Sequence, residues 1–442
     1  MYPPELLVPA KNLERLKVAI TYGADAVYVG GQNYGLRARA DNFTNTELAQ
    51  GVDFAHRHGA KVYLTLNAFL HDADFEGLVD YCRFLEAIGV DAAIVSDLGV
   101  IRTLQSASNL DIHLSTQASC LNASAAKLWE RLGIKRLIVG RELSVAEAGA
   151  IRNQANIDVE MFVHGAMCMA YSGHCTISNF TAGRDSNRGG CIQSCRLPYQ
   201  ISDVGSPSIE SSSSVWQLKR TQVAFADAQY SDREAVLPLS SKNVVDREPQ
   251  TFYKTFMSSK DLWGIDRIEA FFNHQICSLK IEGRMKSSFY VAVTCKAYRQ
   301  LIDAYAQGSL DEVQLTQIAA ELESVPHRDY CSGSLAAPAG HDSVFGQLSG
   351  INTGSHQYLG LVMETTPETF LIRLVEPLSV GDEVEVLPVQ GEAIGWQIQR
   401  LFSVTGKPLA QIRNDSVVGL ARADAPAAAS AIGRCNVLRK RA

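Results

Sequence analysis

The chain has 442 residues, enough for two or three domains, and 46% of them are hydrophobic, which allows a large core. Its net charge of −6 excludes a globally basic nucleic-acid-binding protein but not a local basic patch. No apolar run is long enough to span a bilayer, and the first residues lack the features of a signal peptide. We therefore expect a cytoplasmic protein without a membrane partner.

Eight short apolar runs, rich in Val, Ile and Leu, recur along the chain. Runs of this kind are typical of strands buried on both faces of a parallel sheet. They are Leu6–Pro9, Ala26–Val29, Val62–Asn67, Ala92–Ser96, Ile112–Thr116, Leu137–Val139, Val159–Val163 and Ser278–Ile281. Helical stretches lie between them, so the pattern predicts a (β/α)8 TIM-like barrel. An open doubly wound sheet is the alternative, but the first run is not followed by a glycine-rich phosphate loop.

The seventh and eighth runs are separated by far more residues than an ordinary barrel connection contains. We therefore predict a barrel domain at residues 1–335 that carries a Cys-rich insertion at 165–275 after strand seven. Within the insertion, we expect Asp203–Arg220 to be a surface loop and Tyr253–Asn273 to contain an N-capped helix. Residues 336–442 alternate apolar and polar residues between turn signals, which predicts a small C-terminal antiparallel β-barrel domain.

The insertion opens with a cluster of cysteines. They are Cys168, Cys175, Cys191 and Cys195. In a reducing compartment, clustered cysteines are more often ligands than disulfides, and four thiolates suit an iron–sulfur cluster or a zinc ion. The wide spacing between the first two favours a cluster, with zinc as the alternative. A catalytic pair of one cysteine with His164 or His174 would leave the other cysteines unexplained, and no hydrolase motif is present.

The residues that follow the eight runs are unusually polar and include several arginines. Barrel active sites lie at the carboxyl ends of the strands, so these residues are expected to form the rim of one site. Arginine pairs bidentately with carboxylate and phosphate, which favours an anionic ligand. For any single residue, a structural ion pair across the rim is the equal alternative.

Four sequence motifs resemble the collagenase-like peptidase family, peptidase U32: HGAMCMAYSGHC, NRGGCIQSCRLPY, MSSKDL and SLKIEGRMKS. The opening ELLVPAKNLERLKVAITYGADAVYVGG is similar as well, so the resemblance covers about residues 5–335. The insertion and the C-terminal domain look most like the branch that hydroxylates the wobble uridine of tRNA to 5-hydroxyuridine. This resemblance implies oxygen-independent hydroxylation, with prephenate as the hydroxyl source and tRNA as the partner.

The resemblance also implies a [4Fe-4S] cluster and a set of site residues. Cys168, Cys175 and Cys191 match the ligand pattern of the family. Cys195 fits the C-x3-C pair of one branch, while in another branch the fourth cysteine lies further along the insertion. Cys195 is assigned as the fourth ligand because no cysteine occurs here between Cys195 and Cys277. Prephenate is a dicarboxylate, so arginines of the rim are candidate clamps for it or for tRNA phosphates. The candidates for substrate binding are Arg37, Gln117, Arg141, Arg196, Lys280 and Arg284, and those for catalysis are His164, Tyr171 and Glu282. A U32-type peptidase and a non-catalytic, cluster-bearing assembly subunit are the alternative functions.

Overall fold

The computed structural model describes residues 3–36, 42–197, 199–203, 216–220, 251–254, 258–344 and 353–442. Arg37, one of the predicted substrate-binding residues, lies outside the described residues.

Eight parallel strands form a closed barrel in sequence order, because β12 pairs with β7 on one side and with β1 on the other. The strands are β1 (Glu5–Pro9), β2 (Ala26–Gly30), β3 (Lys61–Leu66), β4 (Ala92–Val95), β5 (Asp111–Leu114), β6 (Arg136–Ile138), β7 (Asp158–Ala166) and β12 (Ser278–Ile281). Each overlaps one of the apolar runs in the sequence. The predicted (β/α)8 barrel is therefore confirmed, and the open sheet is excluded.

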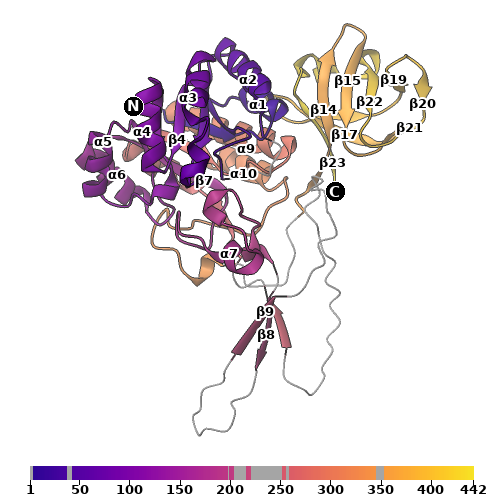
Figure 1. Ribbon diagram of the computed structural model, residues 1–442. Helices are drawn as coiled ribbons and strands as arrows, with labels where there is room; N and C mark the ends of the chain where they lie inside the picture. Colours follow the sequence, from indigo (N-terminus) through magenta and orange to yellow (C-terminus); the bar gives the residue numbers. More distant parts are fainter. Residues whose placement is uncertain are drawn as a thin grey trace.

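Helices cover the outside of the barrel (Figure 1). They are α1 (Leu13–Thr21), α2 (Asn45–Arg57), α3 (Leu78–Ala87), α4 (Leu98–Ala107), α5 (Ala123–Arg131), α6 (Val145–Ala155), α8 (Ile268–Asn273), α9 (Ser288–Ala306) and α10 (Glu312–Leu322). Polar side chains fix several starts: Thr44 and Ser144 form capping boxes with Glu47 and Glu147 at α2 and α6. In the described parts of the chain, no helix has both the length and the apolar character to cross a membrane.

The insertion contains a short helix and a small sheet. Helix α7 (Ile177–Ala182) follows the first two cysteines of the cluster. Strands β8 (Tyr199–Asp203), β9 (Trp216–Arg220) and β10 (Thr251–Lys254) form an antiparallel sheet with β8 in the centre. Figure 1 shows β8 and β9 outside the barrel, on the side where α7 lies. The prediction of a surface loop at Asp203–Arg220 is therefore wrong at its end, where Trp216–Arg220 form β9.

The return to the barrel also differs from the sequence prediction. Residues Asp261–Trp263 form β11, which pairs antiparallel with the end of β7 and parallel with β13 (Tyr330–Cys331). Only the second half of the predicted N-capped helix is helical, and α8 has no side-chain cap. The strand forms because β7 extends beyond the barrel to Ala166 and offers an edge for pairing.

The C-terminal residues form a curled antiparallel sheet with its own hydrophobic core, while the predicted boundary at residue 336 stays a prediction. Its strands are β14 (His356–Thr365), β15 (Thr369–Leu374), β17 (Glu383–Leu387), β18 (Ile394–Gln397), β19 (Leu401–Ser403), β20 (Pro408–Leu409), β22 (Val417–Ala421) and β23 (Val437–Arg441). A separate two-stranded sheet pairs β16 (Leu378–Ser379) with β21 (Gln411–Ile412).

The C-terminal sheet is fixed to the outside of the barrel against α1 and α9. The hydroxyl of Tyr22 donates to the backbone oxygen of Leu387 at 2.6 Å and accepts from the amide of Val437 at 3.2 Å. Lys296 Nζ donates to the backbone oxygens of Pro388 at 2.8 Å and Gly391 at 2.7 Å. These contacts place the sheet beside the barrel (Figure 1).

Candidate active site at the barrel mouth

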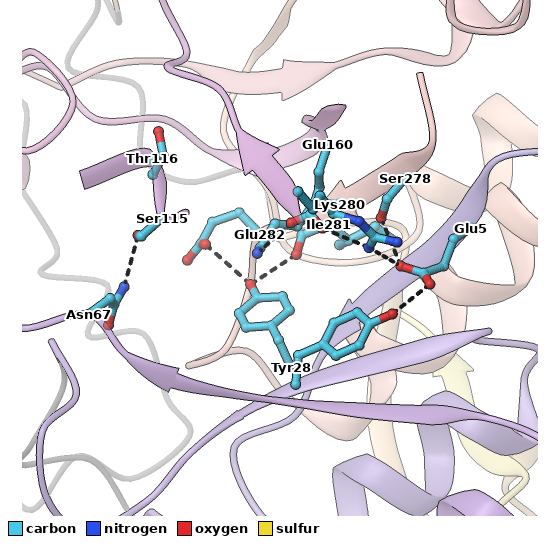
Figure 2. A network of polar contacts seen from close by, with 12 residues as sticks. Glu5, Tyr28, Asn67, Ser115, Thr116, Glu160, Ser278, Lys280, Ile281 and Glu282 are labelled. Atoms are coloured by element: carbon cyan, nitrogen blue, oxygen red, sulfur yellow. Dashed lines mark hydrogen bonds and ion pairs between the residues drawn. The ribbon is translucent and has the colours of Figure 1, made fainter. Parts of the chain in front are cut away.

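A buried ion network fills part of the barrel interior (Figure 2). Glu160, from β7, has no exposed surface and accepts from Lys280 Nζ at 2.8 Å and from Arg136 at 3.3 Å. Arg136 also pairs with Glu5 at 2.6 Å. Two carboxylates therefore balance two cations, which is the condition under which charges are retained in a protein interior.

Tyr28 connects this network to the mouth of the barrel (Figure 2). Its hydroxyl lies 3.0 Å from the backbone oxygen of Ile281 and 3.3 Å from Glu282 Oε2, so it can donate to either. Its ring lies 4.5 Å from Lys280 Nζ. Glu282 is thus held by a neutral donor directly after the eighth barrel strand.

Arg141 lies beside Glu282 at the mouth. Its Nη2 is 3.9 Å from Glu282 Oε2, and its Cζ stands 3.9 Å above the ring of Phe162. The stacked geometry is a cation–π contact, which orients the guanidinium without neutralising it. The Nε atom of Arg141 is buried and has no hydrogen-bond partner among the described residues. That atom is closed to a ligand from outside, so only the remaining, half-buried part of the guanidinium can meet an anion.

The first part of the insertion is fixed across the mouth by contacts with the loops after β5 and β6. The amide of Ser172 donates to Glu142 Oε1 at 2.9 Å, and the amide of Arg141 donates to Ser172 Oγ at 3.4 Å. Gly173 has a φ of +82°, and a Cβ there would collide with the backbone oxygen of Gln117. Glycine is therefore needed for both the left-handed backbone and the close approach.

The second part of the insertion is fixed to the loop after β3. Asn187 Nδ2 donates to the backbone oxygen of Cys175 at 3.0 Å, and the backbone oxygen of Asn187 accepts from the amide of Phe69 at 3.0 Å. Arg188 forms an ion pair with Asp74 in the 3₁₀ helix Asp72–Phe75. The insertion thus spans the mouth from β3 to β7.

The four predicted cysteine ligands all lie in the segment that these contacts fix over the mouth. Burial raises the pKa of the Cys195 thiol, the charge of Arg196 lowers it, and negative charge on the other three thiols raises it. Cys195 therefore lies within electrostatic reach of Cys168, Cys191 and Cys175. Two of the four, Cys168 and Cys191, are exposed, and all ten cysteines of the chain are free thiols.

The four cysteines supply the kind of donor that an iron–sulfur cluster or a zinc ion requires. Among the described residues, no group of three or more His, Cys, Asp or Glu side chains is arranged to hold a metal ion. The fit of these residues to a cluster therefore rests on the chemistry of the donors.

Three of the predicted substrate-binding residues are occupied by contacts within the protein. Lys280 is 4% exposed and pairs with Glu160, and Arg284, at 5% exposed, donates to Thr65 Oγ1 at 3.2 Å. Arg196 donates to backbone and hydroxyl oxygens of the insertion and its return segment. Arg141 and Gln117 remain half-buried at the carboxyl ends of their strands.

The predicted catalytic residues occupy three different environments. Glu282 is at the mouth, and Tyr171 is exposed on the insertion with its ring near His174. His164 is 1% exposed and is surrounded by the rings of Trp263, Tyr290, Tyr298 and Tyr330. Burial lowers the pKa of His164 to about 3, so the imidazole is neutral at physiological pH.

Sequence reasoning missed Tyr28 and Phe162 as members of the site. They lie inside barrel strands that are apolar at nearly every position, so no alternation distinguishes the residues facing the interior. The strand-end rule did identify Glu142, which lies with Arg141 in the loop after β6.

Comparison with known proteins decides the family. Residues 11–344 match the family described as Peptidase family U32. The chain belongs to this family. Among U32 relatives, tRNA hydroxylation protein P1 of Bacillus subtilis is 38% identical over 415 residues, covering 93% of this chain and 90% of that protein. The tRNA hydroxylation protein P of Escherichia coli is 33% identical over 421 residues, covering 92% and 91%.

A U32 relative with a different name is also similar. The protein named collagenase from Porphyromonas gingivalis is 28% identical over 341 residues, covering 74% of this chain and 72% of that protein. The family membership that the sequence motifs indicated is confirmed, and this chain is similar to proteins with both kinds of name.

Proposed function

We propose that this U32 protein is an enzyme that hydroxylates tRNA, converting the wobble uridine to 5-hydroxyuridine without molecular oxygen. The observation that carries the proposal is its similarity, over about nine tenths of both chains, to proteins named for tRNA hydroxylation. The barrel mouth supports it, because polar residues and four thiols meet at the end where barrel enzymes bind substrates.

We further propose that a [4Fe-4S] cluster is held by Cys168, Cys175, Cys191 and Cys195. Such a cluster would supply one-electron redox chemistry at the mouth of the barrel. Zinc, the alternative metal, cannot change its oxidation state. In this proposal the uridine lies at the mouth, beneath the four cysteines of the insertion and beside Glu282.

We propose prephenate as the hydroxyl source, bound at Arg141. A dicarboxylate needs a cationic partner, and Arg141 offers a half-buried guanidinium fixed on Phe162 at the mouth. Glu282 lies 3.9 Å from that guanidinium and is held by Tyr28, so it can take up or release a proton beside the bound acid.

Mass spectrometry of tRNA nucleosides tests the proposed reaction. Cells lacking the protein are expected to lose 5-hydroxyuridine and to regain it with the wild-type gene but not with a Cys168→Ala/Cys175→Ala variant. The matched control is Cys435→Ala, which removes a buried thiol in the turn before β23 and should restore the nucleoside. An unchanged level of 5-hydroxyuridine in the deletion strain would overturn the proposal.

A peptidase is the second candidate, supported by the similarity to the protein named collagenase. It predicts cleavage of collagen-derived peptides that co-purifies with the protein and survives replacement of the four cysteines. The tRNA reaction, by contrast, requires the cysteines, so the same cysteine variants separate the two functions.

A further inference from the structure

A cavity of about 250 Å³ lies at the amino ends of the barrel strands, at the end opposite the mouth. One water molecule needs only about 10–15 Å³ of such space, so the cavity admits a small organic molecule. Its rim consists of charged side chains at the starts of four strands. Lys61, Asp111 and Asp158 are the first residues of β3, β5 and β7, and Lys135 directly precedes β6. We call this space the basal cavity.

The floor of the basal cavity consists of aromatic rings. Side chains two positions apart on a strand lie on the same face, so Tyr63 follows Lys61 toward the barrel interior and His113 follows Asp111. Tyr63 and His113 are 2% and 5% exposed, and their rings pack edge to face with centroids 4.7 Å apart. Burial lowers the pKa of His113 to about 3, so this ring is neutral at physiological pH.

The floor also carries no unbalanced charge. Arg136 lines the cavity but is paired with Glu5 at 2.6 Å and with Glu160 at 3.3 Å. The hydroxyl of Tyr63 donates to Glu5 Oε2 at 2.7 Å. A ligand in the basal cavity therefore meets ring surfaces at the floor and meets unpaired charge only at the rim.

The rim offers two cations and two anions. All four side chains are exposed, and none of them forms an ion pair or a side-chain hydrogen bond with another described residue: Lys61, Lys135, Asp111 and Asp158. Asp91 also lines the cavity, but it is held by a backbone amide at 2.8 Å and by a histidine at 3.0 Å. The unpaired charges of the rim are therefore two of each sign.

This charge pattern determines the class of ligand. A purely anionic molecule would meet the two carboxylates of the rim, and a metal ion or organic cation would meet the two lysines, so each would be repelled by half of the rim. A molecule that carries both charges can pair with both halves, and charge-assisted hydrogen bonds are the strong ones.

We infer that the basal cavity binds a free amino acid. Its carboxylate lies at Lys61 and Lys135, and its ammonium group lies at Asp111 and Asp158. Its side chain lies against the rings of the floor. The barrel thus has two separate binding ends, and the basal end takes a zwitterion that the reaction at the mouth does not use.

Isothermal titration calorimetry on the full chain tests the class of ligand. The probes are the standard amino acids, one at a time, and then the N-acetyl derivative and the methyl ester of any that binds. At least one amino acid is expected to bind. Each derivative has lost one of the two charges, so it is expected to bind at least about ten-fold more weakly.

Substitutions at the rim test the position of the ligand. Lys61→Gln/Lys135→Gln removes the two cations, and Asp111→Asn/Asp158→Asn removes the two anions. Each double variant is expected to bind the amino acid at least about ten-fold more weakly than the wild type. All four side chains are exposed, so the fold is expected to be retained, which circular dichroism checks.

The matched control is Lys127→Gln/Glu130→Gln, which removes one cation and one anion from exposed positions of α5 and should leave binding unchanged. The inference is overturned if no amino acid binds the wild type at millimolar concentration. A ligand that binds either rim variant as tightly as the wild type also overturns it, because the site would lie elsewhere. Equal binding of the N-acetyl derivative or the methyl ester would show that the site does not require a zwitterion.

Discussion

Lys280 donates a 2.8 Å hydrogen bond to Glu160 on the neighbouring strand β7, and both side chains are buried inside the barrel. Lysine in this position was a candidate for substrate binding. Its contacts instead make it one member of a four-charge network with Arg136 and Glu5.

The first prediction concerns this pair. Lys280→Met leaves Glu160 with one cationic partner fewer, and breaking a buried pair costs about 3–5 kcal/mol. Urea denaturation should show that loss for Lys280→Met and for Glu160→Gln. The Glu160→Gln/Lys280→Met double variant should lose less than the sum of the two. If Lys280 contacted substrate instead, Lys280→Met would raise KM and leave the free energy of unfolding unchanged.

The second prediction concerns Arg141. Lysine keeps the charge but loses the planar stacking on Phe162, so Arg141→Lys should bind the anionic co-substrate more weakly. Hydrogen bonds to charged groups contribute about 1.5–3 kcal/mol, so KM for prephenate should rise roughly ten-fold or more. Steady-state hydroxylation of tRNA measures this. Arg102→Gln, at an exposed arginine of α4, is the control and should leave KM unchanged.

A feature of this structure could be predicted from the sequence when the pattern that indicates it lies within one short segment. The eight apolar runs and the four clustered cysteines are local patterns, so they predicted the barrel and the insertion over its mouth. In strands that are buried on both faces, the sequence of the strand does not show which face a side chain lies on. Lys280 could therefore not be assigned to the ion network from the sequence.

Pairing between distant segments is hidden from the sequence for the same reason. Strand β11 exists because Trp263 pairs with His164 on the extended end of β7, a contact between residues nearly a hundred positions apart. The same extension places His164 among aromatic rings rather than at the open rim. Arg196 likewise donates to the backbone oxygen of Ser259, which lies 63 positions further along the chain.

The third prediction concerns the contact between barrel and C-terminal sheet. Tyr22→Phe leaves the backbone oxygen of Leu387 and the amide of Val437 without their buried partner, which costs about 1–3 kcal/mol. Chemical denaturation should show this loss. Tyr305→Phe is the control, because the Tyr305 hydroxyl makes no hydrogen bond within the described part of the chain. Equal stability of the Tyr22→Phe variant and the wild type would mean that water satisfies both groups.

The last prediction concerns acid stability. His113 is 5% exposed inside the barrel, and burial, reinforced by the charge of Arg136, lowers its pKa from 6.5 to about 3. As pH falls below about 6.5, the unfolded chain binds a proton that the folded chain does not, so the free energy of unfolding decreases until pH approaches 3.

Each such histidine contributes up to about 1.4 kcal/mol per pH unit to this slope. His113→Gln should therefore show a flatter decline in stability between pH 6 and pH 4 than the wild type, as measured by urea denaturation at a series of pH values. His164, with its similarly lowered pKa, keeps part of the slope in that variant. Replacing the exposed His341 by Gln should leave the slope unchanged. Parallel stability curves for the wild type and His113→Gln would show that His113 takes up its proton equally in the folded and unfolded chain.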